Sequence, residues 1–591
     1  MREKTNSRSF FDSFLFQAAA LTAASLIVFG ASIGFAFCLD DHTMFARIRQ
    51  LPGPLAIFGA GDIFQTYYRP LFILSLAVEH SLTQAPWLQH LTNVLLHILV
   101  ALMALAVARR LLSNSPWAFV AALAFAVHPS RAENVAWISG RTDLLASGGM
   151  LLALLLLWRA RTERNVFLAV LSGLSGILAM FSKETALLSP LLMLAGWWAV
   201  RPSPSDKQGQ SSPKKGPPGR HGAVLVLCLV LQGAGIILLL VLRSAAHSGV
   251  PMEPLFPTFG GTLLNAARNF ALYLWHVFTG GGEEYLVLGW RMVKSSGLNF
   301  MPLPSDAWHL LGISIALLLF LGWASWALLE ICVQDPTRRQ SHRVVLVSLS
   351  LFAAFLFPTL GFIPIQYNYS TRFLYLPLLF FVIALGGTLD LFFARGPTGK
   401  PSPRHPSSVL ALACLVLLLG GAVKTFRDTL RWKDDVTLFS FMTSRCPQVP
   451  AAFTCLGIGY RHRADTDAPG TPAVLADWLN AARYSEKARR IWPQFGDAYL
   501  IEGGALRMAA RSDPLHADSL LIAAIRAYVA GAQEIPDNPL LPMYAGDTYF
   551  GAGNLTAAEK AYQEALRRDP ANSDAQERLR VVAKMKGPFL K

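Results

Sequence analysis

The chain has 591 residues, of which 53% are hydrophobic and only 15% are charged, and its mean hydropathy is +0.40. Soluble domains carry about a quarter charged residues, so this composition excludes a soluble enzyme, a fibrous protein and a disordered chain. The formal charge of +15 is not arranged in basic stretches interleaved with aromatic residues, as single-stranded nucleic acid would require. We therefore expect an all-α, polytopic membrane protein with one soluble part, and no nucleic-acid partner.

The first span is predicted from the apolar run at 14–37, which follows three basic residues. This run is longer than the core of a cleaved signal peptide, which has about 7–15 residues. Two weaker segments, 70–85 and 262–279, contain ionisable residues and are predicted to be interfacial helices. Ten further spans bring the expected total to about eleven: 88–108, 116–128, 143–158, 165–181, 186–200, 222–243, 307–333, 344–362, 373–393 and 407–424.

The distribution of basic residues predicts the orientation of these spans. With a cytoplasmic N-terminus, the cytoplasmic pieces hold 19 Lys and Arg in 68 residues, whereas the opposite loops hold 10 in 122. Positive residues favour the cytoplasmic side, so the region after the last span is expected to be periplasmic or luminal. The membrane is the bacterial inner membrane, or the endoplasmic reticulum if the source is eukaryotic.

After the last span the composition becomes soluble and a repeat appears. The repeat period is 34 residues between Pro536 and Pro570, and two upstream units follow the same pattern with nine and twelve inserted residues. Small residues at these positions allow two antiparallel helices to approach closely. Tetratricopeptide repeats have this spacing, and three are enough for a small α-solenoid. We therefore predict a membrane domain at 1–425 and a repeat domain at 426–591. The positions that match in the final unit are Gly546, Tyr549, Gly553, Ala558, Tyr562, Ala565 and Pro570.

On the predicted map, the dense polar clusters outside the repeats share the non-cytoplasmic side. Ionisable residues beside hydrocarbon are costly unless they are paired or functional. Because separate hairpins supply them to one face, we expect a single cavity at that surface. The candidate site residues are Asp40, Asp41, Arg69, His128, Glu133, Arg141, Asp143, Lys183, Glu184, Tyr369 and Arg372.

Several of these residues also have a structural interpretation. Asp40 and Asp41 could cap an interfacial helix, and Lys183 with Glu184 could mark a membrane boundary.

Two ion pairs could likewise be structural: Arg141 with Asp143, and Arg131 with Glu133. The polar residues of 90–97 are expected to form hydrogen bonds between helices rather than a metal site, and the sequence predicts no metal ligands.

Six motifs precede the repeats along the chain: LDDHTMF (39–45), YYRPL (67–71), HLTNVLLH (90–97), FAVHPSRAENVAWISGRTDLLA (125–146), MFSKETAL (180–187) and STRFLYLP (370–377). In this order, and with the repeats after them, these motifs resemble the transmembrane-and-tetratricopeptide-repeat-containing (TMTC) family of O-mannosyltransferases and its bacterial relatives. That family has the GT-C membrane glycosyltransferase fold, and the resemblance covers nearly the whole chain.

The resemblance implies a polyprenyl-phosphate sugar as donor and transfer to a protein hydroxyl outside the cytoplasm. An acid in the first external loop serves as the base in GT-C enzymes, which here falls on Asp40 or Asp41. A departing lipid phosphate gains negative charge that Arg141, Lys183 or Arg372 could stabilise. The repeats would then offer a groove for a protein or peptide acceptor.

Two departures from the family pattern lie near the tenth span: Thr371 stands where an acid is common, and Leu378 where Ser is usual. Donor recognition is therefore expected to differ there. The alternatives left open are a non-catalytic membrane scaffold and a GT-C enzyme that acts on glycolipid or cell-wall glycan. The sequence also leaves open the sugar, any divalent metal, and a disulfide between Cys446 and Cys455.

Overall fold

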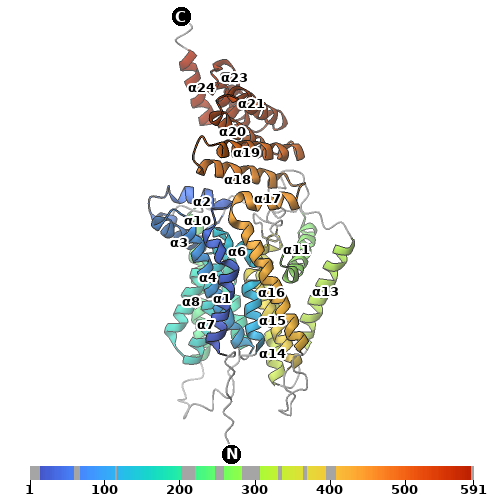
Figure 1. The fold of residues 1–591 in the computed structure, drawn as a ribbon. Coiled ribbons are helices and arrows are strands. Elements are labelled where there is room, and N and C mark those ends of the chain that lie inside the picture. The colour runs from blue at the N-terminus through green and yellow to red at the C-terminus, as the bar shows by residue number, and fades with distance from the viewer. Residues whose placement is uncertain are drawn as a thin grey trace, which may run out of the picture. The chain divides into compact units, whose positions relative to one another are not determined.

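The computed structural model describes residues 13–58, 67–112, 116–200, 220–246, 258–281, 307–329, 336–363, 369–393 and 408–586. Within these ranges the chain forms helices and no strands (Figure 1), which confirms the all-α expectation. It divides into two compact units. The described residues up to Lys433 form one unit, here called the membrane unit. Those from Asp434 onwards form the other, the repeat unit.

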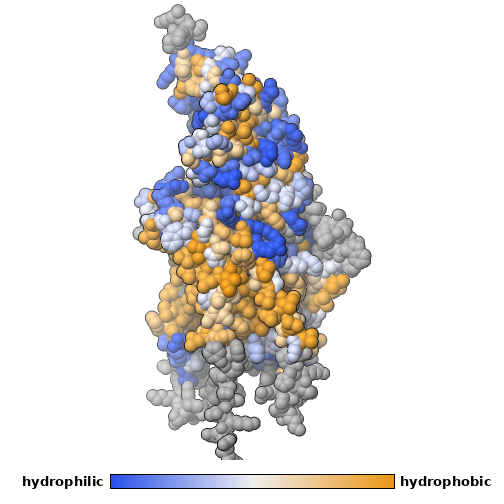
Figure 2. Space-filling model, in the orientation of Figure 1, coloured by the Kyte–Doolittle hydropathy of each residue, from blue (hydrophilic) through white to orange (hydrophobic). Residues whose placement is uncertain are grey.

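Seven helical stretches of the membrane unit are long and apolar enough to cross a bilayer, and all seven coincide with expected spans. The face of the membrane unit drawn in Figure 2 is largely apolar, as a lipid-facing surface requires. In α16, for example, Leu417 is 74% exposed. The helices of these seven stretches are α1 (Phe14–Phe29), α4 (Trp87–Leu111), α7 (Arg141–Glu163), α10 (Arg220–Ala245), α14 (Pro336–Leu356), α15 (Tyr375–Phe393) and α16 (Ser408–Leu430).

The other four expected spans are helical as well: α5 (Pro116–Val127), α8 (Val166–Met180), α9 (Ser189–Ala199) and α13 (Ala307–Leu329). The first three have 12, 15 and 11 residues. At 1.5 Å per residue they are too short to cross about 30 Å of hydrocarbon. They pack beside long helices, as α8 does along α7 and α10.

One end of the bundle carries short helices and turns, among them α2 and α3 (Figure 1). A separate apolar core holds α2 and α3 together, with Phe45 and Phe72 among its members. The short elements of the membrane unit and α11 are η2 (Gly30–Gly34), α2 (Asp40–Ile48), η3 (Pro54–Phe58), α3 (Pro70–Leu82), η4 (Pro129–Arg131), α6 (Ala132–Ala136), η5 (Ile138–Gly140), η6 (Glu184–Leu188), α11 (Phe259–Thr279), η10 (Phe357–Thr359), η11 (Thr371–Leu374) and η12 (Arg431–Lys433).

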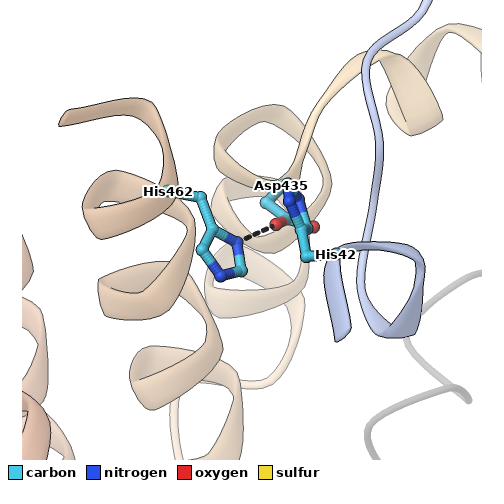
Figure 3. Close-up of side chains that lie close together, drawn as sticks. All are labelled: His42, Asp435 and His462. Carbon is cyan, nitrogen blue, oxygen red and sulfur yellow. Dashed lines mark hydrogen bonds and ion pairs between the residues drawn. The ribbon is translucent and has the colours of Figure 1, made fainter. Parts of the chain in front are cut away.

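The repeat unit is a series of antiparallel helix pairs. A Cβ atom on Gly546 would lie 2.6 Å from the Tyr562 ring, so the small residue permits the close approach that the sequence predicted. Between α17 and α18, His462 Nδ1 lies 3.0 Å from Asp435 Oδ2 (Figure 3). Cys446 and Cys455 are not joined by a disulfide. The helices are α17 (Asp435–Arg445), α18 (Pro450–Thr466), α19 (Pro472–Ile491), α20 (Gly496–Ser512), α21 (Ala517–Glu534), α22 (Leu540–Gly551), α23 (Leu555–Arg568) and α24 (Ser573–Lys586).

Candidate active site

The acidic pair Asp40 and Asp41 forms the first turn of α2. The preceding residue, Leu39, has φ +56° and ψ −125°, a conformation that an L-residue adopts only at a cost and that clusters at functional sites. Asp41 is fully buried, whereas Asp40 is half-buried. The structure thus separates two acids that the sequence could not.

Two hydrogen bonds orient the Asp41 carboxylate. Ser139 Oγ donates to Oδ1 at 2.9 Å, and the Cys38 backbone N–H donates to Oδ2 at 3.2 Å. Burial raises the pKa of Asp41 to about 7, although both hydrogen bonds oppose the rise. Burial therefore moves the titration of this carboxyl group towards neutral pH.

Arg141, at the start of α7, is fully buried and surrounded by acceptors. Its Nη2 forms an ion pair with Glu79 Oε2 at 2.9 Å. Its Nε donates to Asn93 Oδ1 at 2.8 Å. Further hydrogen bonds reach the Ser75 hydroxyl at 3.2 Å and the Gln89 carbonyl at 2.7 Å. Arg141 therefore connects α3, α4 and α7, and its guanidinium is already engaged by the protein.

Lys183 and Asp143 form a second buried ion pair between the loop after α8 and the first turn of α7. Asn134 Nδ2 also donates to Asp143, at 3.2 Å. Burial lowers the pKa of Lys183, while the charge of Asp143 opposes that change. The ammonium group also lies 5.4 Å from the centre of the Phe373 ring.

Glu133 and Arg372 form a third pair, with Oε1 and Nη1 3.6 Å apart. Glu133 also accepts hydrogen bonds from the Ser370 hydroxyl at 2.8 and 3.0 Å. Burial raises the pKa of Glu133 despite the charge of Arg372. The Arg372 guanidinium lies 5.0 Å from the Trp137 ring centre, so this pair connects α6 with η11.

Arg69 and Glu184 form the most accessible pair, with side chains 21% and 29% exposed. Two guanidinium nitrogens of Arg69 donate to Glu184, at 2.7 and 2.9 Å. Burial alone would raise the pKa of Glu184, but the charge and hydrogen bonds of Arg69 outweigh it and the pKa is lowered. Arg69 also stacks 4.2 Å from the Tyr67 ring centre.

The segment 133–143 joins these groups. It supplies Glu133 to Arg372, Ser139 to Asp41 and Asp143 to Lys183. Both expected ion pairs are wrong: Arg141 pairs with Glu79 rather than with Asp143, and Glu133 pairs with Arg372 rather than with Arg131. Residues two apart on a helix differ by about 200° in direction, so such neighbours face different partners.

Two further candidates take part in packing contacts. The His128 Nε2–H donates to the Val277 carbonyl at 2.9 Å, while Nδ1 accepts from the Ser130 N–H. Burial lowers the pKa of His128 to about 3. The buried Tyr369 ring stacks on Tyr273, and its hydroxyl contacts a histidine of α11. Both residues connect the site to α11.

The hydrogen-bonding role expected for the polar residues of 90–97 is confirmed for Asn93 and His97. Asn93 Nδ2 donates to the Trp137 carbonyl at 3.0 Å, and His97 bonds to the Tyr375 hydroxyl at 2.8 Å. Sequence reasoning missed Glu79 and Ser139 as site residues. Glu79 could have been found, because it is a lone acid in an apolar helix. Ser139 is uncharged and lies within a longer motif, so no comparable signal marks it.

A cleft opens beside the Lys183–Asp143 pair. Asp143, Ser147 and Thr185 provide its polar atoms, while Phe355 and Phe373 belong to its apolar wall. Polar and apolar side chains therefore line the same small cleft.

The fold and site together define a polytopic α-helical membrane protein with one polar end and an attached α-solenoid. Comparison with known proteins shows that the chain is similar to TMTC proteins. The protein O-mannosyl-transferase Tmtc1 of Drosophila melanogaster is 27% identical over 516 residues, covering 74% of this chain and 58% of the relative. Human TMTC4 is 24% identical over 418 residues, covering 64% of this chain and 53% of the relative.

A shorter stretch is more similar. Human protein O-mannosyl-transferase TMTC2 is 45% identical over 89 residues, or 15% of this chain and 11% of the relative. The chain thus spans little more than half the length of the Drosophila and TMTC4 relatives. No family model matches the chain.

Proposed function

We propose that the chain is an integral-membrane glycosyltransferase of the GT-C type. It transfers a sugar, mannose by analogy with its relatives' names, from a polyprenyl phosphate to a Ser or Thr hydroxyl of a protein on the non-cytoplasmic side. The observation that carries this proposal is Asp41, a fully buried carboxylate held by two hydrogen bonds at the polar end of a membrane helix bundle.

Asp41 suits the role of general base. An acceptor hydroxyl is a weak nucleophile, and a base with a pKa near the working pH removes its proton most effectively. As the new bond forms at the anomeric carbon, the bond from that carbon to the phosphate oxygen breaks, and the polyprenyl phosphate leaves with its negative charge. Each Asp41 oxygen keeps a second lone pair for the acceptor beside the hydrogen bond that it already accepts.

The leaving phosphate would contact Arg69 and Arg372 first. These side chains are 21% and 13% exposed, whereas that of Lys183 is 5% exposed. A guanidinium binds phosphate in a bidentate manner. The polyprenyl tail would stay in the bilayer, while its head reaches the polar end of the bundle. The donor role expected for Arg141 is less well supported, because four protein groups already engage it.

The repeat unit would bind the acceptor protein. The chain enters it at Asp434, directly after η12, which lies against the loop that precedes Asp41. The basic asymmetry of the sequence supports a non-cytoplasmic position for this end.

A transfer assay with purified protein tests the proposal, using Asp41→Asn and, as the matched neighbour, Asp40→Asn. Asparagine keeps the shape but accepts no proton, so Asp41→Asn should reduce turnover by on the order of a hundredfold or more. Donor binding should survive, because the carboxylate acts on the acceptor. Unchanged turnover in both variants would refute the catalytic assignment and favour the scaffold alternative.

A further inference from the structure

The last turn of the membrane unit, η12, contacts the loop that leads to Asp41. The Ala36 N–H donates to the Lys433 carbonyl at 2.9 Å. The Cys38 thiol donates to the Trp432 carbonyl at 3.4 Å. Cys38 also provides one of the two hydrogen bonds to Asp41 through its backbone N–H. One side of the Asp41 site therefore rests on η12.

The Trp432 side chain contacts the other side of the site. It is 1% exposed, and its ring stacks on Trp137 with 5.9 Å between the centroids and 23° between the planes. Trp137 lies two residues before Ser139, which supplies the second hydrogen bond to Asp41. The Trp137 ring also contacts Arg372. Both segments that orient Asp41 thus pack against the same residue.

We propose that Trp432 is a positioning residue that holds the Asp41 carboxylate in place through Cys38 and Trp137. The inference rests on the proposed function, in which Asp41 is the base. The hydrogen bonds to Asp41 come from Cys38 and Ser139 rather than from Trp432, so the contribution of Trp432 is to fix the two donor segments and to exclude water. It belongs to the last turn before the repeat unit, a place where no sequence motif of the site lies.

Removal of the indole should change the titration of Asp41 as well as the rate. Water that enters the vacated space reduces desolvation, the main cause of the raised pKa. The charged and titratable groups around Asp41 are Asp40 and His42 on α2, Arg141 on α7 and the Cys38 thiol. The substitution leaves all of them in the chain. A lower pKa would therefore report the loss of burial.

The kinetic test compares Trp432→Ala with Trp432→Phe. Trp158→Ala is the control, because Trp158 is also buried in the membrane unit but its indole N–H donates to the Gly196 carbonyl, outside the site. Trp432→Ala should lower kcat about tenfold or more, with donor KM within about twofold, because misplaced groups cost rate. The acid limb of the pH–kcat profile of Trp432→Ala should move by about one pH unit or more towards lower pH. Trp432→Phe should restore most of the kcat and most of the position of the acid limb. A lower kcat with an unmoved acid limb would overturn the positioning role.

A second readout does not depend on activity. Alkylation of Cys38 by N-ethylmaleimide is followed by peptide mass spectrometry in the natively folded, detergent-solubilised protein. Cys228 in α10, buried and bonded to the Ala169 carbonyl, is the internal control. Trp432→Ala should raise the Cys38 rate about tenfold or more and leave the Cys228 rate unchanged. Equal Cys38 rates in wild type and variant would refute the contact.

Two outcomes keep the proposals distinguishable. If both cysteines react faster, the alanine variant has lost its fold. Trp432→Leu, which keeps more side-chain volume, must then show the selective increase in Cys38 alkylation. If Trp432→Leu shows no such increase, the inference is overturned. If the wild type transfers no sugar from any polyprenyl-phosphate donor, the proposed function fails, while the alkylation result still decides whether Trp432 holds the loop before Asp41.

Discussion

Arg141 is expected to stabilise the fold rather than to bind substrate, and Arg141→Met tests this. The guanidinium is fully buried and bonds to Glu79, Asn93, Ser75 and the Gln89 carbonyl. Methionine fills part of the volume but leaves the Glu79 carboxylate without its partner in an apolar helix. Breaking one side of a buried ion pair costs about 3–5 kcal/mol, so the variant should melt well below wild type.

The assay is thermal unfolding in detergent, followed by intrinsic fluorescence at one fixed scan rate because membrane proteins often unfold irreversibly. A second change, Glu79→Leu, removes the orphaned carboxylate. The double variant should therefore recover about 1–3 kcal/mol relative to simple addition. Arg159→Met on the same helix is the matched control, since its ion pair with Glu163 is exposed and screened by water. Its melting temperature should equal that of wild type.

One pattern would refute this reasoning. If Arg141→Met has the melting temperature of wild type and only its affinity for a lipid-phosphate sugar falls, the four contacts of the Arg141 guanidinium contribute little to the stability of the fold. Arg141 would then be a donor-binding residue, as the sequence alone suggested.

Three further predictions concern other regions. Gly546→Ala should destabilise the repeat unit, because the new methyl group would lie 2.6 Å from Tyr562. Gly551→Ala is the control: its methyl group would meet nothing within 4 Å, so it should be neutral or stabilising by up to about 1 kcal/mol. Hydrogen exchange of the repeat peptides distinguishes the two variants. Asp41→Asn should raise the melting temperature relative to wild type at pH 8 but not at pH 4. The pKa of Asp41 is about 7 in the folded state and 3.8 in the unfolded state, so the aspartate destabilises the folded protein increasingly as the pH rises between these values. Equal differences in melting temperature at both pH values would contradict this. Leu515→Cys, at a position 92% exposed, should react with an impermeant maleimide from the non-cytoplasmic side of sealed vesicles, and reaction from the opposite side only would reverse the topology.

The helices were predictable because hydropathy and repeat spacing are local properties of the chain. The seven long spans followed from apolar runs, and the helix pairs followed from the recurring small residues. The apolar runs that contain the short helices α5, α8 and α9 predict full spans, because composition does not reveal the residue at which a helix ends. In α9, for instance, the predicted run at 186–200 begins with the turn η6 before the helix proper starts at Ser189.

The partners of the charged residues were not predictable, because they depend on which helices meet. Arg141 and Glu79 are 62 residues apart in the sequence, and Lys183 and Asp143 are 40 apart. The burial of Asp41 rather than Asp40 could be predicted from the spacing of apolar residues in α2. Asp41 shares one face of α2 with Met44, Phe45 and Ile48, all buried, and that spacing of three, four and seven is visible in the sequence.

The pattern of pairing itself separates structural acids from the proposed base. Glu79, Glu133, Asp143 and Glu184 each form an ion pair with a basic residue of another element. Such pairing makes a charge tolerable at the end of a membrane bundle. Asp41 accepts its two hydrogen bonds from neutral groups and, among the described residues, forms no ion pair. Burial outweighs the nearby charges of His42 and Arg141, so the pKa of Asp41 is raised towards neutral pH, which is the property that a general base needs.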